Sequence, residues 1–213
     1  MAPNPEVTKQ RLITAAEQLF AERGIEGVSL REINMAAGQR NSTALQYHFD
    51  DRYGLVRAVL RKHAPAVDAV RHSMLDEYAA AGRDDLRALA EALVRPSATK
   101  LHDADGSRAY LQINAQVLNR PELRFDERAL SNPRDSIYRW RTLVGPLLPD
   151  VAVRRLHHRF TAIRVSSTEL ARRAASTPRR DDQLFTSHLV DLVAALLAAP
   201  VSAQTAALLR DRP

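Results

Sequence analysis

Residues 28–55, VSLREINMAAGQRNSTALQYHFDDRYGL, decide the fold of the N-terminal part of the chain. Ser29 and Glu32 have the S-x-x-E spacing of a capping box, in which each side chain accepts a hydrogen bond from the backbone N–H of the other residue. This pair marks the start of a helix, and Gly38 ends that helix after about two turns. The stretch therefore begins with a short helix that has a defined residue at each end.

A second short helix follows a tight turn at Gln39 and Arg40. Asn41 or Ser42 can cap this helix, and its apolar pattern ends near Phe49. Two short helices that are joined by a glycine-containing turn and flanked by longer helices are the sequence form of a helix-turn-helix. The sequence therefore predicts this motif in the N-terminal part of the chain.

The rest of the chain also favours helices. Glycine is sparse, at 7 residues, and aromatic residues make up 5% of the chain, while alanine, leucine and arginine dominate, a mixture that suits helices better than strands. We predict an all-α protein with a helix-turn-helix domain at residues 1–62 and a larger helical domain at residues 63–213. Pro65 is expected to kink or break the helix that begins near residue 51. The helices expected beyond it cover residues 65–81, 84–102, 107–119, 126–147, 151–176 and 181–199, and the tail at 201–213 is either a short helix or frayed.

The second short helix has one polar and one apolar face. At 100° per residue, Thr43, Gln46 and Tyr47 fall within one arc, and Leu45 and Phe49 fall on the opposite side. The polar arc offers a hydroxyl, an amide and a phenol, which are groups that read base edges and phosphates in a major groove. An ordinary solvated face is the alternative interpretation. The residues expected to contact DNA are Arg40, Asn41, Ser42, Thr43, Gln46, Tyr47, His48 and Arg52, of which His48 suits the core or a backbone contact and Arg52 suits a phosphate.

The charge of the chain does not identify the region that meets nucleic acid. The net charge is +6, which permits a polyanionic partner without requiring one. Residues 1–60 hold seven basic and seven acidic side chains, whereas residues 154–180 hold eight arginines and one acidic residue. The arginine-rich segment suits either an anionic lipid surface or the solvated face of a packed helix, and its apolar stripe favours the packed helix.

Several motifs around the second short helix resemble those of the TetR family. Ala37-Gly38, Tyr47-His48-Phe49, Arg52 and Leu55 match the A-G, Y-x-F and F-x-x-K-x-x-L pattern of that family, over about residues 8–60. Gly38 to Phe49 is one residue longer than the usual spacing, and Arg52 replaces the commoner lysine. The resemblance implies a homodimeric, ligand-responsive repressor that binds a double-stranded DNA operator. It further implies a divergent C-terminal domain that binds a small-molecule effector and dimerises through the last two long helices.

Two sets of residues in the larger domain are candidates for these roles. The last two long helices carry broad apolar stripes that need a partner beyond one neighbouring helix. The candidate dimer residues are Leu156, Phe160, Ile163, Phe185, Leu189, Leu192 and Leu196. A buried amide at Asn114 could orient an apolar ligand, and Tyr110, Phe125 and Trp140 are bulky enough to line its cavity. Core packing is the alternative for each of these bulky residues.

Other function classes are disfavoured by what the sequence lacks. It has no cysteine, no G-x-S-x-G motif and no pair of histidines at metal-binding spacing, since adjacent His157 and His158 point about 100° apart on a helix. It also lacks a signal peptide and an apolar stretch of the ~20 residues that span a bilayer. We therefore expect a cytoplasmic, non-enzymatic protein without a cofactor or a membrane partner. A helical adaptor that does not bind DNA is the runner-up hypothesis.

Overall fold

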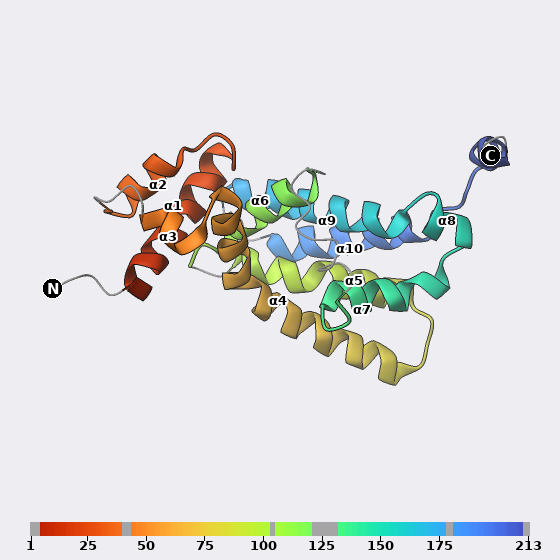
Figure 1. Ribbon diagram of the computed structural model, residues 1–213. Coiled ribbons are helices and arrows are strands. Elements are labelled where there is room, and N and C mark those ends of the chain that lie inside the picture. Colours follow the sequence, from red (N-terminus) through yellow and green to blue (C-terminus); the bar gives the residue numbers. More distant parts are fainter. Residues whose placement is uncertain (1–4, 40–43, 103–104, 121–131, 178–180, 211–213) are drawn as a thin grey trace.

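The computed structural model describes residues 5–39, 44–102, 105–120, 132–177 and 181–210, and every regular element within these ranges is helical (Figure 1). The all-α prediction is therefore confirmed for this part of the chain. A small N-terminal group of helices lies at one end of a longer helical bundle. No helix in the described ranges is long and apolar enough to cross a membrane.

The N-terminal group contains the predicted helix-turn-helix. It consists of α1 (Pro5–Arg23), α2 (Leu30–Ala36), α3 (Ala44–Phe49) and the start of α4 (Arg52–Ala81). The predicted capping box is present: the Ser29 hydroxyl accepts from the Glu32 N–H at 3.2 Å, and the Glu32 carboxylate accepts from the Ser29 N–H at 2.8 Å. Leu45 and Phe49 are buried in the core between these helices, as the helical periodicity of α3 predicts.

The prediction that the helix breaks at Pro65 is wrong. The helix α4 begins at the Asp51 cap and continues through Pro65 to Ala81, where Gly82 ends it in the left-handed conformation. A proline removes only one backbone hydrogen bond, and burial of Val67 and Leu75 on the following turns holds the helix against the bundle. The predicted domain boundary at residue 62 therefore falls inside a continuous helix that runs from the N-terminal group into the bundle (Figure 1).

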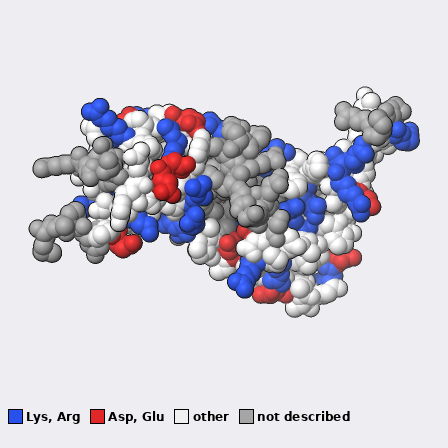
Figure 2. Space-filling view, in the orientation of Figure 1, with Lys and Arg blue, Asp and Glu red and all other residues white. Residues whose placement is uncertain are grey.

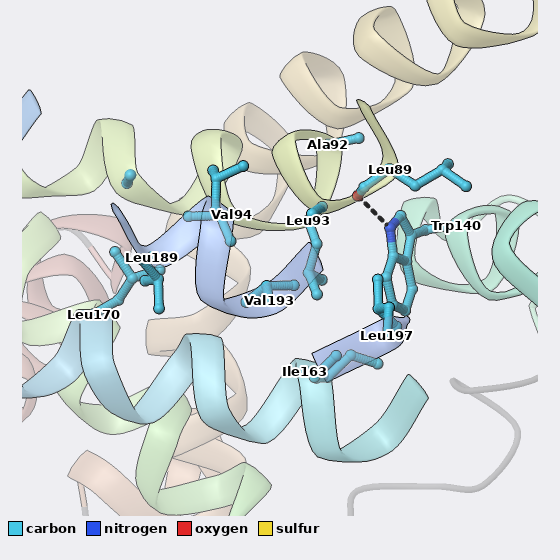
Figure 3. Packing of buried hydrophobic residues seen from close by; sticks show 14 of the residues in the cluster. Leu89, Ala92, Leu93, Val94, Trp140, Ile163, Leu170, Leu189, Val193 and Leu197 are labelled. Atoms are coloured by element: carbon cyan, nitrogen blue, oxygen red, sulfur yellow. Dashed lines mark hydrogen bonds between the residues drawn. The ribbon is translucent and has the colours of Figure 1, made fainter. Parts of the chain in front are cut away.

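The bundle is built from the remaining helices around one apolar core. They are α5 (Leu86–Ala98), η1 (Thr99–Leu101), α6 (Ser107–Leu118), α7 (Ser136–Val144), η4 (Gly145–Leu147), α8 (Asp150–Arg154), α9 (His158–Ala175), α10 (Asp182–Leu197) and α11 (Ala203–Arg210). Figure 3 shows Trp140 against Leu93 and Leu197 in this core, with its indole N–H donating to the Leu89 carbonyl at 2.7 Å. Trp140 thus ties α7 to α5.

Two predicted helices of the bundle have different limits. The described part of the helix expected at residues 126–147 begins only at Ser136, because the Asp135 carboxylate caps α7 by accepting from two backbone N–H groups. The helix expected at residues 151–176 is divided into α8 and α9 by His157, which has a φ of 55°. This bend allows Ala152 and Ala162 both to be fully buried, and no glycine or proline in the sequence signals it.

Candidate nucleic-acid interface and ligand cavity

The outer face of α3 carries exposed polar side chains on a well-anchored helix. Gln46 is exposed, and Tyr47 is 82% exposed, although an aromatic residue of this size is usually at least half-buried. Leu45 and Phe49 fix the opposite face in the core, and His48 is half-buried between the two faces, with its ring 5.1 Å from that of Tyr47. The helix therefore presents an amide and a phenol to solvent.

The other expected DNA contacts lie before and after α3. Arg40, Asn41, Ser42 and Thr43 lie outside the described residues. Arg52 is described, and its guanidinium donates to the Ile25 carbonyl and lies 3.7 Å from the Glu26 carboxylate. Arg52 therefore fastens the start of α4 to the turn that follows α1.

The surface charge of the molecule is mixed. Figure 2 shows Lys and Arg interspersed with Asp and Glu over the visible face of the N-terminal helices. Several of these charges are paired within the N-terminal group, including Arg23 with Glu32 at 2.8 Å. Hydrogen bonds from the Ser29 hydroxyl, and to a smaller extent from the Ser29 backbone, lower the pKa of Glu32 from 4.5 to about 2. This carboxylate therefore stays ionised in the first turn of α2. The geometry of α3, rather than a strong positive field, distinguishes this surface.

A cavity of about 490 Å³ lies in the bundle between α4, α5, α6, α7 and α9. Tyr110 and Asn114, two of the four residues expected at a ligand site, line it. Trp140 does not line it, because the indole is fully buried in the core beside Leu89. Phe125 lies outside the described residues.

The cavity wall contains a buried arginine that was not predicted from the sequence. Arg71 is 4% exposed, and it donates to the Ala92 carbonyl at 3.1 Å, to the Ser136 hydroxyl at 2.7 Å and to the Ser97 hydroxyl at 3.3 Å. Burial lowers the pKa of Arg71, and the nearby Asp68 carboxylate acts in the opposite direction. An arginine on an amphipathic helix normally lies on its solvated face, so only its partners, 21 to 65 residues away, reveal its burial.

The candidate dimer residues divide between the inside and the outside of the bundle. Ile163 and Leu189 are buried in the core of the chain itself, and Phe160 lines the cavity. Leu192 is 49% exposed, and Leu184, eight residues earlier on the same face of α10, is 70% exposed. Leu156, Phe185 and Leu196 are half-buried. The exposed apolar surface of α10 is therefore centred on Leu184 and Leu192.

Side chains from α4 and α6 connect the bundle to the N-terminal helices. Gln116 of α6 accepts from the Ile25 N–H at 2.9 Å with its amide oxygen. Glu17 of α1 is 1% exposed, and its carboxylate binds His63 and, at 2.9 Å, the Lys62 ammonium. The His63 ring lies 5.1 Å from the ring of Tyr110, which lines the cavity. A continuous set of contacts therefore joins the cavity wall to α1.

Comparison with known proteins identifies the N-terminal domain. Residues 12–59 match the family model of bacterial regulatory proteins of the tetR family. No curated protein matches the sequence significantly. A structure of a putative TetR-family transcriptional regulator from Mesorhizobium loti is similar in fold, with a TM-score of 0.52, 19% identity and coverage of 92% of this chain and 97% of that chain.

Two functionally described structures are more distant in fold. NalD, the secondary repressor of the MexAB-OprM multidrug efflux pump in Pseudomonas aeruginosa, has a TM-score of 0.49 and 21% identity, and the match covers 89% of this chain and 96% of that one. A gamma-butyrolactone receptor, described as an ArpA-like protein, has a TM-score of 0.46 and 19% identity, with coverage of 89% and 98%.

Proposed function

We propose that the chain, whose residues 12–59 match the tetR family model, is a DNA-binding transcriptional regulator of the TetR family and acts as a homodimeric repressor whose operator binding is relieved by a small molecule. The exposed polar face of α3 carries this proposal, because Gln46 and Tyr47 are presented to solvent by a helix whose other face is fixed in the core. An exposed amide of this kind can pair bidentately with adenine in the major groove.

In the proposed dimer, α9 and α10 of one subunit pack against those of the other. The exposed Leu184 and Leu192 of α10 support this arrangement, since two large apolar side chains on one face gain stability when a partner covers them. The two α3 helices then enter successive major grooves, which lie ~34–36 Å apart on one face of the duplex. The protein acts in the cytoplasm, where the operator lies.

The ligand changes the affinity for DNA by favouring one of two subunit arrangements. A ligand shifts such an equilibrium only by the difference between its affinities for the two states. The contacts from α6 to α1, of which Gln116 to Ile25 is one, give the cavity a direct connection to the helices that carry α3. Filling of the cavity moves α6, and the spacing of the two α3 helices no longer fits the operator.

DNA binding is tested by selecting sites from a random-sequence duplex pool with the purified protein. We expect a sequence-selective complex that weakens as salt rises, because phosphate contacts release counterions. Gln46→Ala is expected to weaken binding to the selected site by about 5- to 150-fold and to relax the base preference at one position, which corresponds to about 1–3 kcal/mol for a bidentate contact. Its slope against salt should stay unchanged, since glutamine carries no charge.

A matched control and two contrary outcomes complete this experiment. Gln204→Ala removes an exposed amide from α11, far from α3, and should bind DNA like the unmodified protein. Unchanged affinity and base preference in Gln46→Ala would show that another face of the domain reads the bases. The absence of any selective complex at low salt would refute the repressor proposal and favour the helical adaptor.

A further inference from the structure

The cavity contains a buried phenol without a hydrogen-bond partner. Tyr110 is 6% exposed and lines the cavity, and its hydroxyl makes no hydrogen bond within the described residues. Burial raises the pKa of Tyr110 to about 12, so the phenol is protonated at neutral pH and can donate. Buried hydroxyls are nearly always hydrogen-bonded. The hydroxyl of this cavity residue is therefore available to an acceptor that enters the cavity from outside the chain.

The guanidinium of Arg71, which also lines the cavity, offers further donors. A guanidinium has five N–H groups, and Arg71 directs three hydrogen bonds to Ala92, Ser136 and Ser97. The Asp68 carboxylate lies 3.6 Å from Nη1, which is beyond hydrogen-bond distance. Two N–H groups of Arg71 thus have no partner among the described residues, and Arg71 and Tyr110, which both line the cavity, interact electrostatically.

Two carboxylates lie around Arg71, so this part of the cavity already has more negative than positive charge without a ligand. Asp68 accepts from the Ser136 hydroxyl, and Asp135 accepts from the Ile137 and Tyr138 N–H groups at the start of α7. Both carboxylates line the cavity, and both interact electrostatically with Arg71. An anionic ligand would add a buried negative charge beside these two, which is costly. A cationic ligand would have the positive charge of Arg71 beside it, and the Asp68 and Asp135 carboxylates already accept hydrogen bonds within the chain.

The remaining wall of the cavity is mainly apolar. Leu93, Leu111, Ile163 and Leu170 are buried core residues that line it, and Arg164, the other arginine of the wall, is exposed to solvent. The volume of about 490 Å³ lies within the range of about 300–1,000 Å³ that holds drug-sized ligands. The cavity wall is thus mainly apolar, with polar side chains that include the donors Arg71 and Tyr110.

We propose that this cavity binds an uncharged, mainly apolar small molecule whose carbonyl or hydroxyl oxygen accepts hydrogen bonds from Tyr110 and Arg71. The proposal rests on the proposed function only in assigning this molecule the role of effector. The Tyr110 ring packs against His63, which binds Glu17 of α1. A ligand that engages the Tyr110 hydroxyl therefore acts on a cavity residue that leads, through His63 and Glu17, to the DNA-binding helices.

The test uses probes that share a skeleton and differ in the polar group. 2-Decanone, 2-decanol, decanoate and decane, together with their twelve-carbon analogues, are titrated into the full-length protein at neutral pH by calorimetry. We expect the ketone or the alcohol of a matched set to bind, and to bind at least about tenfold more tightly than the carboxylate, because only the carboxylate adds a buried negative charge beside Asp68 and Asp135. Failure of every ketone and alcohol to bind up to its solubility would overturn the proposal, as would tighter binding of the carboxylate.

Variants locate the bound oxygen. Tyr110→Phe removes only the hydroxyl and should weaken ketone binding by about 2- to 12-fold, the effect of one hydrogen bond, while decane, where it binds, is unaffected. Tyr138→Phe removes a phenol from α7 that does not line the cavity and should leave binding unchanged. Equal ketone affinity in Tyr110→Phe and the unmodified protein, with unaltered thermal unfolding, would refute the role of Tyr110.

A parallel gel shift on the selected DNA separates the two proposals. Release of DNA by the ketone supports both the ligand class and its role as effector. Calorimetric binding of the ketone without release of DNA supports the ligand class and contradicts the proposed induction.

Discussion

Glu17 holds the N-terminal helices to the bundle, and its replacement by glutamine tests this directly. The carboxylate is 1% exposed, with His63 at one oxygen and the Lys62 ammonium 2.9 Å from the other. Although burial lowers the pKa of Lys62, its hydrogen bonds to Glu17 and Asp105 outweigh this and raise the pKa overall. Glu17→Gln keeps the size of the side chain but replaces one acceptor oxygen by an NH₂ group, which cannot serve a cation.

The magnitude follows from the burial of this cluster. Breaking a buried ion pair by removing one partner costs about 3–5 kcal/mol. Lys62 keeps Asp105 as a second partner, with Nζ at 3.0 Å from its carboxylate, so the lower end of that range, about 3 kcal/mol, is expected. For a chain of this size, that corresponds to a decrease in Tm of about 6–12 °C.

The assay is thermal unfolding followed by far-UV circular dichroism at neutral pH. Glu22→Gln, an exposed position on the same helix, serves as the control and should change Tm little. A double-mutant cycle with Lys62→Met isolates the contact, because the cost of Lys62→Met should decrease when Glu17 is already glutamine. A Glu17→Gln melt within about 2 °C of the control, or strictly additive effects in the cycle, would refute the reasoning.

Three further predictions concern other parts of the molecule. Gly106 has a φ of 76°, and a Cβ atom there would lie 2.2 Å from the Glu17 carboxylate. Gly106→Ala should therefore lower the free energy of unfolding by more than the cost of the left-handed backbone alone, which is about 1–2 kcal/mol. A smaller loss in urea titrations would contradict the close contact between Gly106 and Glu17. The pKa of Glu32 is lowered from 4.5 to about 2, so the contribution of its carboxylate to stability is fully present above pH 4.5 and is lost as the pH falls towards 2. Glu32→Gln should therefore lower Tm at pH 7, and its Tm should converge with that of the unmodified protein near pH 2. A difference in Tm that does not depend on pH would exclude this linkage. Leu192→Glu should shift the protein from dimer to monomer in light scattering, whereas Leu208→Glu, at an exposed position on α11, should not; an unchanged dimer would place the interface elsewhere.

The helix-turn-helix was predictable because its signals are local. Ser29 and Glu32 are three residues apart, Gly38 has the φ of 68° that ends a helix, and the alternation of Leu45 and Phe49 with Gln46 fixes the faces of α3. Each of these signals acts within one or two helical turns. No distant partner is needed to read them.

The errors in the bundle have the opposite cause. Pro65 is a strong local signal for a helix end, but tertiary contacts of Val67 and Leu75 keep α4 continuous. The division between α8 and α9 has no local signal, because His157 takes the left-handed conformation only where the packing requires it. Helix limits predicted from local propensity were therefore wrong at these two places, where packing in the core determines them.

The polar residues of the cavity and of the domain contact were missed for a related reason. Arg71 and Glu17 stand on amphipathic helices where a charge normally faces solvent. Their partners are distant: Ser136 is 65 residues from Arg71, and His63 is 46 residues from Glu17. A single sequence does not reveal which helices become neighbours, so only the expected Tyr110 and Asn114, on a helix that alternates polar and apolar residues, were placed at the cavity.

The helix α6 explains why the cavity and the DNA-binding helices cannot be treated as separate. Its residues Tyr110 and Asn114 line the cavity, Ile113 is packed in the core of the N-terminal helices, and Val117 contributes to both. Because these residues lie within two turns of one rigid helix, a ligand that displaces the cavity face of α6 also displaces the face that contacts α1. Gln116 adds a directional link, since its hydrogen bond to the Ile25 N–H breaks with a small displacement. Ligand binding in the cavity and the positioning of α3 therefore both depend on the single helix α6.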